Sequence, residues 1–103
     1  MNYNELMSLQ KAYGYDYYQA MINSGDGWKL EGSVGRHLMS LLECGACMLP
    51  KKSTMDYYGN YIPSRDELKP GSKGTYQNFK SFWEKVDSGE IYLHQEEEEE
   101  FNY

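Results

Sequence analysis

The stretch that decides the fold runs from residue 25 to residue 74. It reads GDGWKLEGSVGRH over 25–37 and, after an apolar block, DYYGNYIPSRDELKPG over 56–71. Glycine and proline at this density confine the backbone to a defined path of turns, and the aromatic residues between them can pack against that path. Disordered linkers are poor in aromatic residues, so this centre of the chain is expected to be ordered.

On the N-terminal side of this centre, a first amphipathic helix is predicted over residues 2–23. Asn2 and Glu5 have the spacing of a capping box. Apolar residues then recur every three or four positions and form one stripe: Leu6, Leu9, Tyr13, Tyr17 and Ala20. Gly14 interrupts the helix, at a cost of about 1 kcal/mol relative to alanine, and indicates a kink or the close approach of a neighbour.

Two further amphipathic helices are predicted. One begins near Ser33, a residue type that caps helices well, and ends at Gly45. Its apolar face carries Val34, Leu38, Leu41 and Leu42. The other covers residues 75–87, with an inward face of Tyr76, Phe79, Trp83 and Val86.

Between these two helices, residues 55–63 predict two short extended pieces around a Gly59-Asn60 turn, as in a small hairpin. Ser64 and Glu67 then have the spacing of a capping box that opens a single turn. The expected fold is mainly α: three amphipathic helices around an irregular, aromatic-rich centre. The hairpin near residues 55–63 would make it α+β.

The size and charge of the chain predict one domain with a separate tail. Its 103 residues suit a single globular domain over 1–94. Five of the 16 acidic residues form the run 96–100, and the remaining 11 face 10 lysines and arginines. The net charge of −6 therefore comes mainly from residues 95–103, which are expected to be a disordered, solvated tail. Direct nucleic-acid binding is disfavoured, because no basic stripe is present.

The composition also predicts a location. The N-terminus has no basic region followed by an apolar run, and no apolar stretch is long enough to span a membrane. Two cysteines without an export signal favour a reducing compartment. The expected location is the cytoplasm, without membrane association, and the host cytoplasm if the protein is encoded by a phage.

Cys44-Gly-Ala-Cys47 has the spacing of a redox dithiol or of half a zinc site. A redox site is disfavoured because Cys44 falls at the end of a predicted helix, where the dipole opposes a thiolate. A zinc site would need His37, seven residues earlier, together with His94. We expect two buried structural thiols instead, with no metal and no cofactor.

Residues 32–37 place glycines, a hydroxyl and a cation at the start of the second predicted helix. Free backbone N–H groups there could bind an anion with the help of Ser33, Arg36 and His37. The P-loop pattern is absent, since no Gly-Lys-Ser/Thr follows. The structural alternative is that Ser33 caps the helix and the glycines allow tight packing against Trp28.

The segment 56–65 is rich in side chains that recognise partners, namely Tyr57, Tyr58, Tyr61 and Arg65. Tyr57 and Tyr58 cannot both face the core of an extended segment, so at least one should be exposed. The segment contains no nucleophile with a base beside it, so no catalytic residue is predicted. The structural alternative is an aromatic loop that covers the second predicted helix.

The centre of the chain, with the stretches 25–36 and 56–65, resembles small proteins of unknown function from phage and mobile-element genomes. The resemblance covers about half of the chain. The resemblance identifies no named family and transfers no residue role. It implies a small interaction protein, a class that includes inhibitors of host defence systems, rather than a metabolic enzyme.

Three functional hypotheses follow. The leading one is a small, non-catalytic protein-interaction module, such as a phage-type inhibitor of a host complex. The second is an acidic mimic of nucleic acid that acts through the glutamate run. The third is a small anion- or ligand-binding protein, or a minor enzyme, that uses Arg36 and His37, and a pocket shared by Arg36 and residues 56–65 would favour it. The surplus of aromatics is also consistent with a homodimer.

Overall fold

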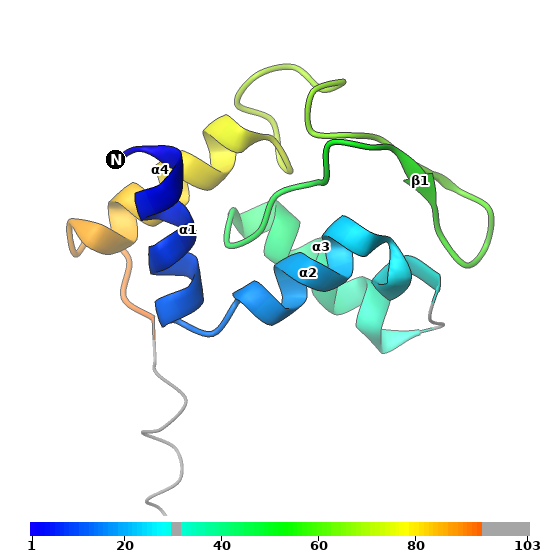
Figure 1. Cartoon of the computed structure of the whole chain (residues 1–103), viewed down its shortest axis with the longest axis horizontal. Coiled ribbons are helices and arrows are strands. Elements are labelled where there is room, and N and C mark those ends of the chain that lie inside the picture. The colour runs from blue at the N-terminus through cyan, green and yellow to red at the C-terminus, as the bar shows by residue number, and fades with distance from the viewer. Residues whose placement is uncertain (30–31, 94–103) are drawn as a thin grey trace, which may run out of the picture.

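The structure is a computed structural model that describes residues 1–29 and 32–93 (Figure 1). Within them the chain is mainly helical with one small antiparallel hairpin, as predicted. The elements are α1 (Tyr3–Ala12), α2 (Asp16–Ser24), the 3₁₀-helix η1 (Asp26–Lys29), α3 (Ser33–Cys44), β1 (Thr54–Met55), β2 (Tyr61–Ile62) and α4 (Tyr76–Asp87). The predicted acidic tail, residues 95–103, lies outside the described residues.

The single helix predicted over residues 2–23 is wrong, because the chain forms two helices with a break around Gly14. Gly14 has a φ of 86°, a left-handed conformation that cannot continue a right-handed helix. The break also shifts the helical phase, so the predicted apolar stripe does not extend into α2. Tyr17 and Ala20 are exposed, whereas Gln19 and Ile22 are buried.

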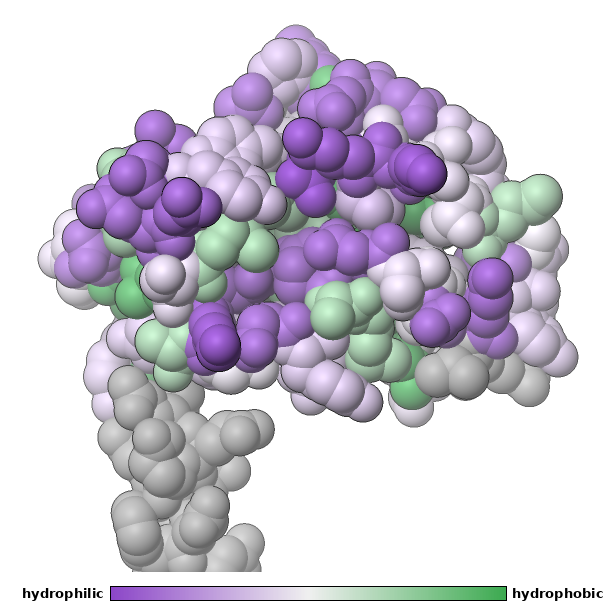
Figure 2. Space-filling view, viewed as in Figure 1, coloured by the Kyte–Doolittle hydropathy of each residue, from purple (hydrophilic) through white to green (hydrophobic). Residues whose placement is uncertain are grey.

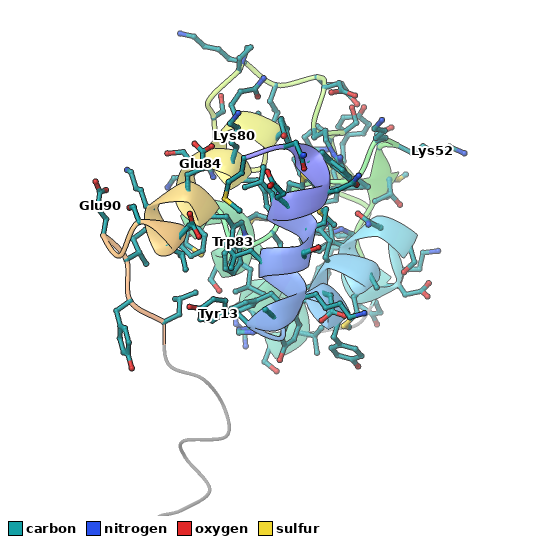
Figure 3. The ribbon with its side chains drawn as sticks, turned by 60° about the vertical axis from the view of Figure 1, so that its left-hand side comes forward. Tyr13, Lys52, Lys80, Trp83, Glu84 and Glu90 are labelled. Atoms are coloured by element: carbon teal, nitrogen blue, oxygen red, sulfur yellow. The ribbon has the colours of Figure 1, made fainter. Side chains whose placement is uncertain are left out.

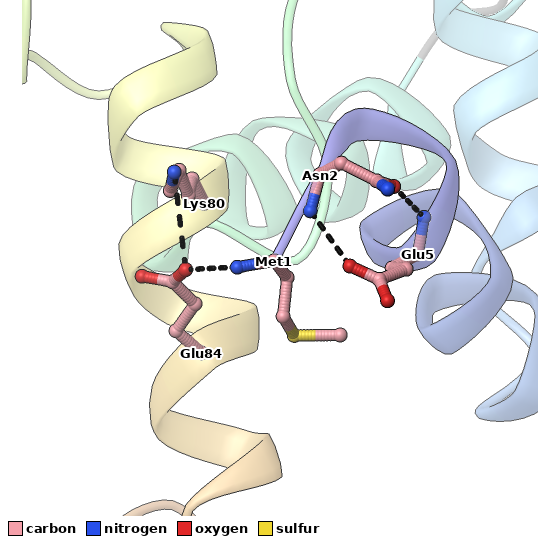
Figure 4. Close-up of polar contacts among 5 residues, drawn as sticks. All are labelled: Met1, Asn2, Glu5, Lys80 and Glu84. Atoms are coloured by element: carbon pink, nitrogen blue, oxygen red, sulfur yellow. Dashed lines mark hydrogen bonds and ion pairs between the residues drawn. The ribbon is translucent and has the colours of Figure 1, made fainter.

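The capping pair at the start of α1 is confirmed. The Asn2 backbone N–H donates to Glu5 Oε1 at 2.8 Å, and the Glu5 N–H donates to Asn2 Oδ1 at 2.8 Å (Figure 4). Nearby, the Met1 amino group lies 2.9 Å from Glu84 Oε2 on α4, with Lys80 Nζ 3.9 Å from the same oxygen. The hydrogen bond from the Met1 amino group lowers the pKa of Glu84 below its usual value.

Helices α3 and α4 follow the predicted pattern. Leu38, Leu41 and Leu42 of α3 are buried and Val34 is partly buried, and α3 ends at Gly45. The buried residues of α4 are Phe79, Trp83, Val86 and also Phe82, which the sequence pattern did not place inward. The prediction that Ser33 caps α3 is wrong: Ser33 is the first helical residue, the N-cap is Gly32, and no side chain of the described residues hydrogen-bonds to the first turn.

A buried stretch of irregular chain, residues 45–50, crosses the centre of the molecule between α3 and the hairpin. We call it the core segment. Its backbone polar groups need partners because they are shielded from water. The Ala46 carbonyl accepts from Gln10 Nε2 at 3.0 Å and from Trp83 Nε1 at 3.1 Å. These side chains thus take the place of the backbone hydrogen bonds that a neighbouring strand would form in a sheet.

Gln19 of α2 pairs with both polar groups of Met48 in the core segment. The Met48 N–H donates to Gln19 Oε1 at 3.0 Å, and Gln19 Nε2 donates to the Met48 carbonyl at 2.8 Å. Gln10 Nε2 also donates to Gln19 Oε1 at 2.9 Å, which joins α1 to the same network. The two glutamines are almost fully buried, so these bonds form in a low-dielectric interior where an unpaired group is costly.

Aromatic packing surrounds the core segment. The Trp83 ring lies 5.7 Å from the Tyr13 ring and 5.0 Å from the Phe82 ring, measured between centroids. Figure 3 shows Tyr13 and Trp83 side by side where α1 meets α4. The face of the molecule in Figure 2 is mostly hydrophilic, with small separated apolar patches. In the described part of the chain, no helix has the length and apolar character needed to cross a membrane.

We expect Gln19→Leu to lower the free energy of unfolding by about 2–5 kcal/mol, because it leaves the Met48 N–H and carbonyl buried without partners. Urea denaturation followed by circular dichroism measures this change. The control is Gln77→Leu at an exposed position of α4, where a change within about 0.5 kcal/mol is expected. A loss at Gln19 no larger than that of the control would contradict the role of the carboxamide.

Candidate functional site

A cleft of about 270 Å³ lies between the start of α3 and the hairpin. We call it the hairpin cleft. One wall comes from η1 and α3 and consists of Trp28, Gly32, Gly35, Arg36 and Met39. The opposite wall comes from the hairpin and consists of Asp56, Tyr57, Tyr58 and Ile62. The structure thus brings Arg36 together with the tyrosine-rich segment, which is the arrangement that the ligand-binding hypothesis required.

The short hairpin is fixed to the body of the protein. In its register Thr54 pairs with Ile62, and Met55 pairs with Tyr61. Because side chains alternate along strands, Ile62 is buried on the inner face, whereas Met55 and Tyr61 are exposed on the outer face. The Tyr57 N–H donates to the Trp28 carbonyl at 2.6 Å, which attaches the end of the hairpin to η1.

The Asp56 carboxylate organises the hairpin turn. Its Oδ1 accepts from the Tyr58 N–H at 2.9 Å and from the Asn60 N–H at 2.8 Å, while its Oδ2 accepts from Asn60 Nδ2 at 3.1 Å. Gly59 completes the turn with a φ of 83°, which residues with a β-carbon rarely adopt. The hydrogen bond from the Asn60 backbone, followed by the other donors, lowers the pKa of Asp56 below its ordinary value.

Glu67 fastens the other end of the hairpin. Its Oε1 accepts from the Tyr61 hydroxyl at 2.6 Å, and its Oε2 accepts from the Ser64 N–H at 2.9 Å. The spacing predicted this Ser64–Glu67 contact at the start of a single turn, and residues 65–66 form a turn. The bond from Tyr61 is the main cause of the lowered pKa of Glu67. Carboxylates therefore hold the backbone on both sides of the exposed tyrosines.

The predicted partner-binding residues fall into two environments. Tyr57, Tyr58 and Tyr61 are all exposed, with 67% of Tyr58 accessible to solvent. Tyr57 and Tyr58 can both reach the surface because this part of the hairpin is a turn rather than an extended strand. Arg65 is only 8% exposed; its Nε donates to the Leu49 carbonyl, and its N–H donates to the Pro50 carbonyl at 2.9 Å. Its guanidinium is thus engaged with the core segment.

Of the three predicted anion-binding residues, only one lines the cleft. Arg36 lines the cleft, is exposed and has no ion-pair partner among residues 1–29 and 32–93. Ser33 does not line the cleft, and the His37 ring packs 4.9 Å from the Tyr18 ring, between centroids. A β-carbon at Gly32 or Gly35 would meet no atom within 4 Å, so these glycines do not serve close packing against Trp28.

The two cysteines are free, and the prediction that both are buried is correct for Cys47 but wrong for Cys44, which is exposed at the end of α3. Burial, together with the neighbouring Cys44, raises the pKa of the Cys47 thiol to about 12. A thiol with so high a pKa is a poor nucleophile and a poor metal ligand at neutral pH. Within the described residues no three histidine, cysteine or acidic side chains cluster as a metal site would require, and His94 lies outside them.

Sequence reasoning did not identify Trp28 and Met39 as site residues. Trp28 is only 3% exposed, yet it lines the cleft, and its Nε1–H has no hydrogen-bond partner within the described part of the chain. Met39 is exposed on α3, beside the buried Leu38. The only signal in the sequence was a tryptophan among glycines, which indicates order but not the position of a cavity.

We expect the Asn60 backbone N–H to report the protonation of Asp56. The folded pKa of Asp56 is lower than the ordinary value of 3.8, so its carboxylate stabilises the hairpin above that pH and loses this effect as the pH falls through the lowered pKa. In an NMR titration the Asn60 amide signal should therefore move with a midpoint below pH 3.8.

The control for this titration is the Asn78 amide, which donates to the hydroxyl of Thr75 at 3.3 Å, a group that does not titrate in this range. Its signal should stay in place while that of Asn60 moves. The Asp56→Asn variant should remove the Asn60 transition. An Asn60 midpoint at or above pH 3.8 would contradict the assigned hydrogen bonds.

Comparisons with known proteins identify no relative of this chain. No family model, no curated protein and no solved structure matches the chain. The functional assignment therefore depends on the chemistry of the hairpin and its cleft.

Proposed function

We propose that the protein is a non-catalytic binding module that docks another protein against the outer end of its hairpin. The docking surface consists of Met39, Met55, Tyr57, Tyr58 and Tyr61, and we call it the hairpin surface. The observation that carries the proposal is that all five side chains are exposed while the backbone of the hairpin is fixed by buried and charged partners. Tyrosine, methionine and arginine are enriched in protein interfaces.

The energetics of the hairpin surface favour binding. A tyrosine has few rotatable bonds and a large amphipathic ring, so it contributes contact area at a small entropy cost. The Tyr57 and Tyr58 rings already meet edge to face at 4.9 Å between centroids, and the Tyr61 hydroxyl is held by Glu67. Side chains ordered before the partner arrives lose less freedom on association.

The chemistry of the hairpin cleft supports binding rather than catalysis. Its titratable side chains are those of Arg36, Asp56, Tyr57 and Tyr58. Asp56 has a lowered pKa and accepts three hydrogen bonds, which makes it a weak base. Among the described residues that line the cleft, no serine, cysteine, lysine or histidine is present to act as a nucleophile or as its base.

A phage-type inhibitor that occupies a surface of a host complex in the cytoplasm fits this proposal, because such an inhibitor needs a rigid contact surface and no catalytic group. The mimicry hypothesis depends on the glutamate run, residues 96–100, which lies outside the described residues. Ionic strength separates the two: a contact through glutamates weakens steeply with added salt, whereas a tyrosine-anchored contact changes little.

We expect Tyr58→Ala to abolish capture of the partner while leaving the melting temperature nearly unchanged, because the ring is exposed and supports no buried atom. The matched control is Tyr17→Ala on α2. Tyr17 is 66% exposed against 67% for Tyr58, and each ring contacts the next tyrosine edge to face. Wild type and both variants are immobilised in parallel, and the proteins that each retains from native host cells are quantified by mass spectrometry.

The proposal predicts a protein retained by wild type and by the Tyr17 variant and lost with the Tyr58 variant. Equal retention by all three baits would contradict the hairpin surface, as would a loss shared by both variants. If the retained species is the chain itself, sedimentation of wild type and the Tyr58 variant identifies the surface as a homodimer contact.

A further inference from the structure

We infer that the hairpin cleft binds a carboxylate of the partner protein, carried on an acidic side chain or on a chain terminus. This inference depends on the proposed function, and it names the chemistry of the group that enters the cleft. Trp28, Arg36 and the first turn of α3 supply the donors. The apolar walls at Met39, Tyr57 and Tyr58 contact the carbon atoms that carry the carboxylate.

Three sets of donors around the cleft have no partner among the described residues. The Trp28 Nε1–H is buried and unpaired among the described residues, although a buried indole N–H normally finds an acceptor. Arg36 makes no ion pair with any described residue and carries five N–H donors. The first turn of α3 receives no side-chain cap from the described residues and itself contains no acidic residue. A ligand that fits these groups must bring acceptors.

The Asp56 carboxylate, an acceptor that lines the cleft, is not the partner of these donors. Asp56 lines the opposite wall, but its two oxygens accept three hydrogen bonds from Tyr58 and Asn60 within the hairpin. These bonds also reduce the repulsion that its charge exerts on an incoming anion. Opposite it stand the guanidinium of Arg36 and the positive end of the α3 dipole, which favours an anion in the first turn.

The two glycines at the start of α3 leave space for the carboxylate. Gly32 and Gly35 line the cleft, and a β-carbon at either position would enter open space rather than meet a neighbour. Glycine inside a helix is destabilising by about 1 kcal/mol relative to alanine, and packing gives no reason for Gly35. Its absence of a side chain keeps the backbone of the first turn accessible from the cleft.

The two tryptophans allow a direct test by NMR on the full chain. Phenylacetate is the probe, because it carries a carboxylate on an aromatic group, and benzyl alcohol is its neutral counterpart. The indole N–H signal of Trp28 should shift on titration with millimolar phenylacetate and should not shift with benzyl alcohol. The Trp83 indole is an internal control, since its Nε1–H already donates to the Ala46 carbonyl at 3.1 Å.

Variants assign the donors. Arg36→Gln should lower the affinity for phenylacetate at least about tenfold, because a charge-assisted hydrogen bond is lost. Lys52→Gln removes an exposed cation outside the cleft lining and should change the affinity little. Gly35→Leu should fill the cleft and abolish the Trp28 shift. The variant should still fold, because a β-carbon at position 35 meets no neighbour within 4 Å.

Three results would overturn the inference: an unmoved Trp28 signal, equal shifts with phenylacetate and benzyl alcohol, or an equal loss of affinity in the Arg36 and Lys52 variants. A shift produced by phenylphosphate but not by phenylacetate would assign the cleft to phosphate instead and would also overturn it. Each result is independent of partner capture by the Tyr58 variant, so a failure of the carboxylate site is distinguishable from a failure of the hairpin surface.

Discussion

The structure depends on how the chain buries residues 45–50 without secondary structure. Eight backbone polar groups of this core segment are hydrogen-bonded to side chains or backbone of other parts of the chain. Gln10 and Gln19 provide the essential contacts, because the Gln19 carboxamide pairs with both polar groups of Met48 as a neighbouring strand would. Without these contacts, the dehydrated groups would oppose the burial of the surrounding apolar side chains.

The same constraint positions the functional surface. The core segment leads directly into the hairpin, and Arg65, which follows the hairpin, returns to hold the Leu49 and Pro50 carbonyls. Both ends of residues 51–64 are therefore attached to the interior, and the Tyr57–Trp28 hydrogen bond attaches the tip. The tyrosines are therefore exposed on a loop that is hydrogen-bonded to the body of the protein at its tip and after its second strand. Rigid display of this kind is what a small domain with a thin core can offer a partner.

The cleft has a division of charge that suits recognition. Among the described residues, its α3 wall carries the unpaired donors of Trp28 and Arg36, and its hairpin wall carries a carboxylate whose hydrogen bonds are internal. The hairpin thus uses its own anion for folding, and the proposed ligand would bind the donors opposite. The fold brings Arg36 and the tyrosine-rich segment, far apart in the sequence, to one cleft, while Arg65 and His37 have other contacts.

The sequence by itself determined the helices α3 and α4, the hairpin turn and the exposure of at least one of Tyr57 and Tyr58, because local periodicity, capping residues and turn glycines act over a few positions. It did not determine that Gly14 divides the first helix, since a glycine in a helical pattern is compatible with a kink as well as a break. Only the tertiary structure decided the burial of Gln10, Gln19 and Arg65. Polar side chains lie at the surface in most proteins, so their sequence pattern predicts exposure. Here their hydrogen-bond partners are backbone groups more than ten residues away, and no local sequence pattern predicts where those groups lie.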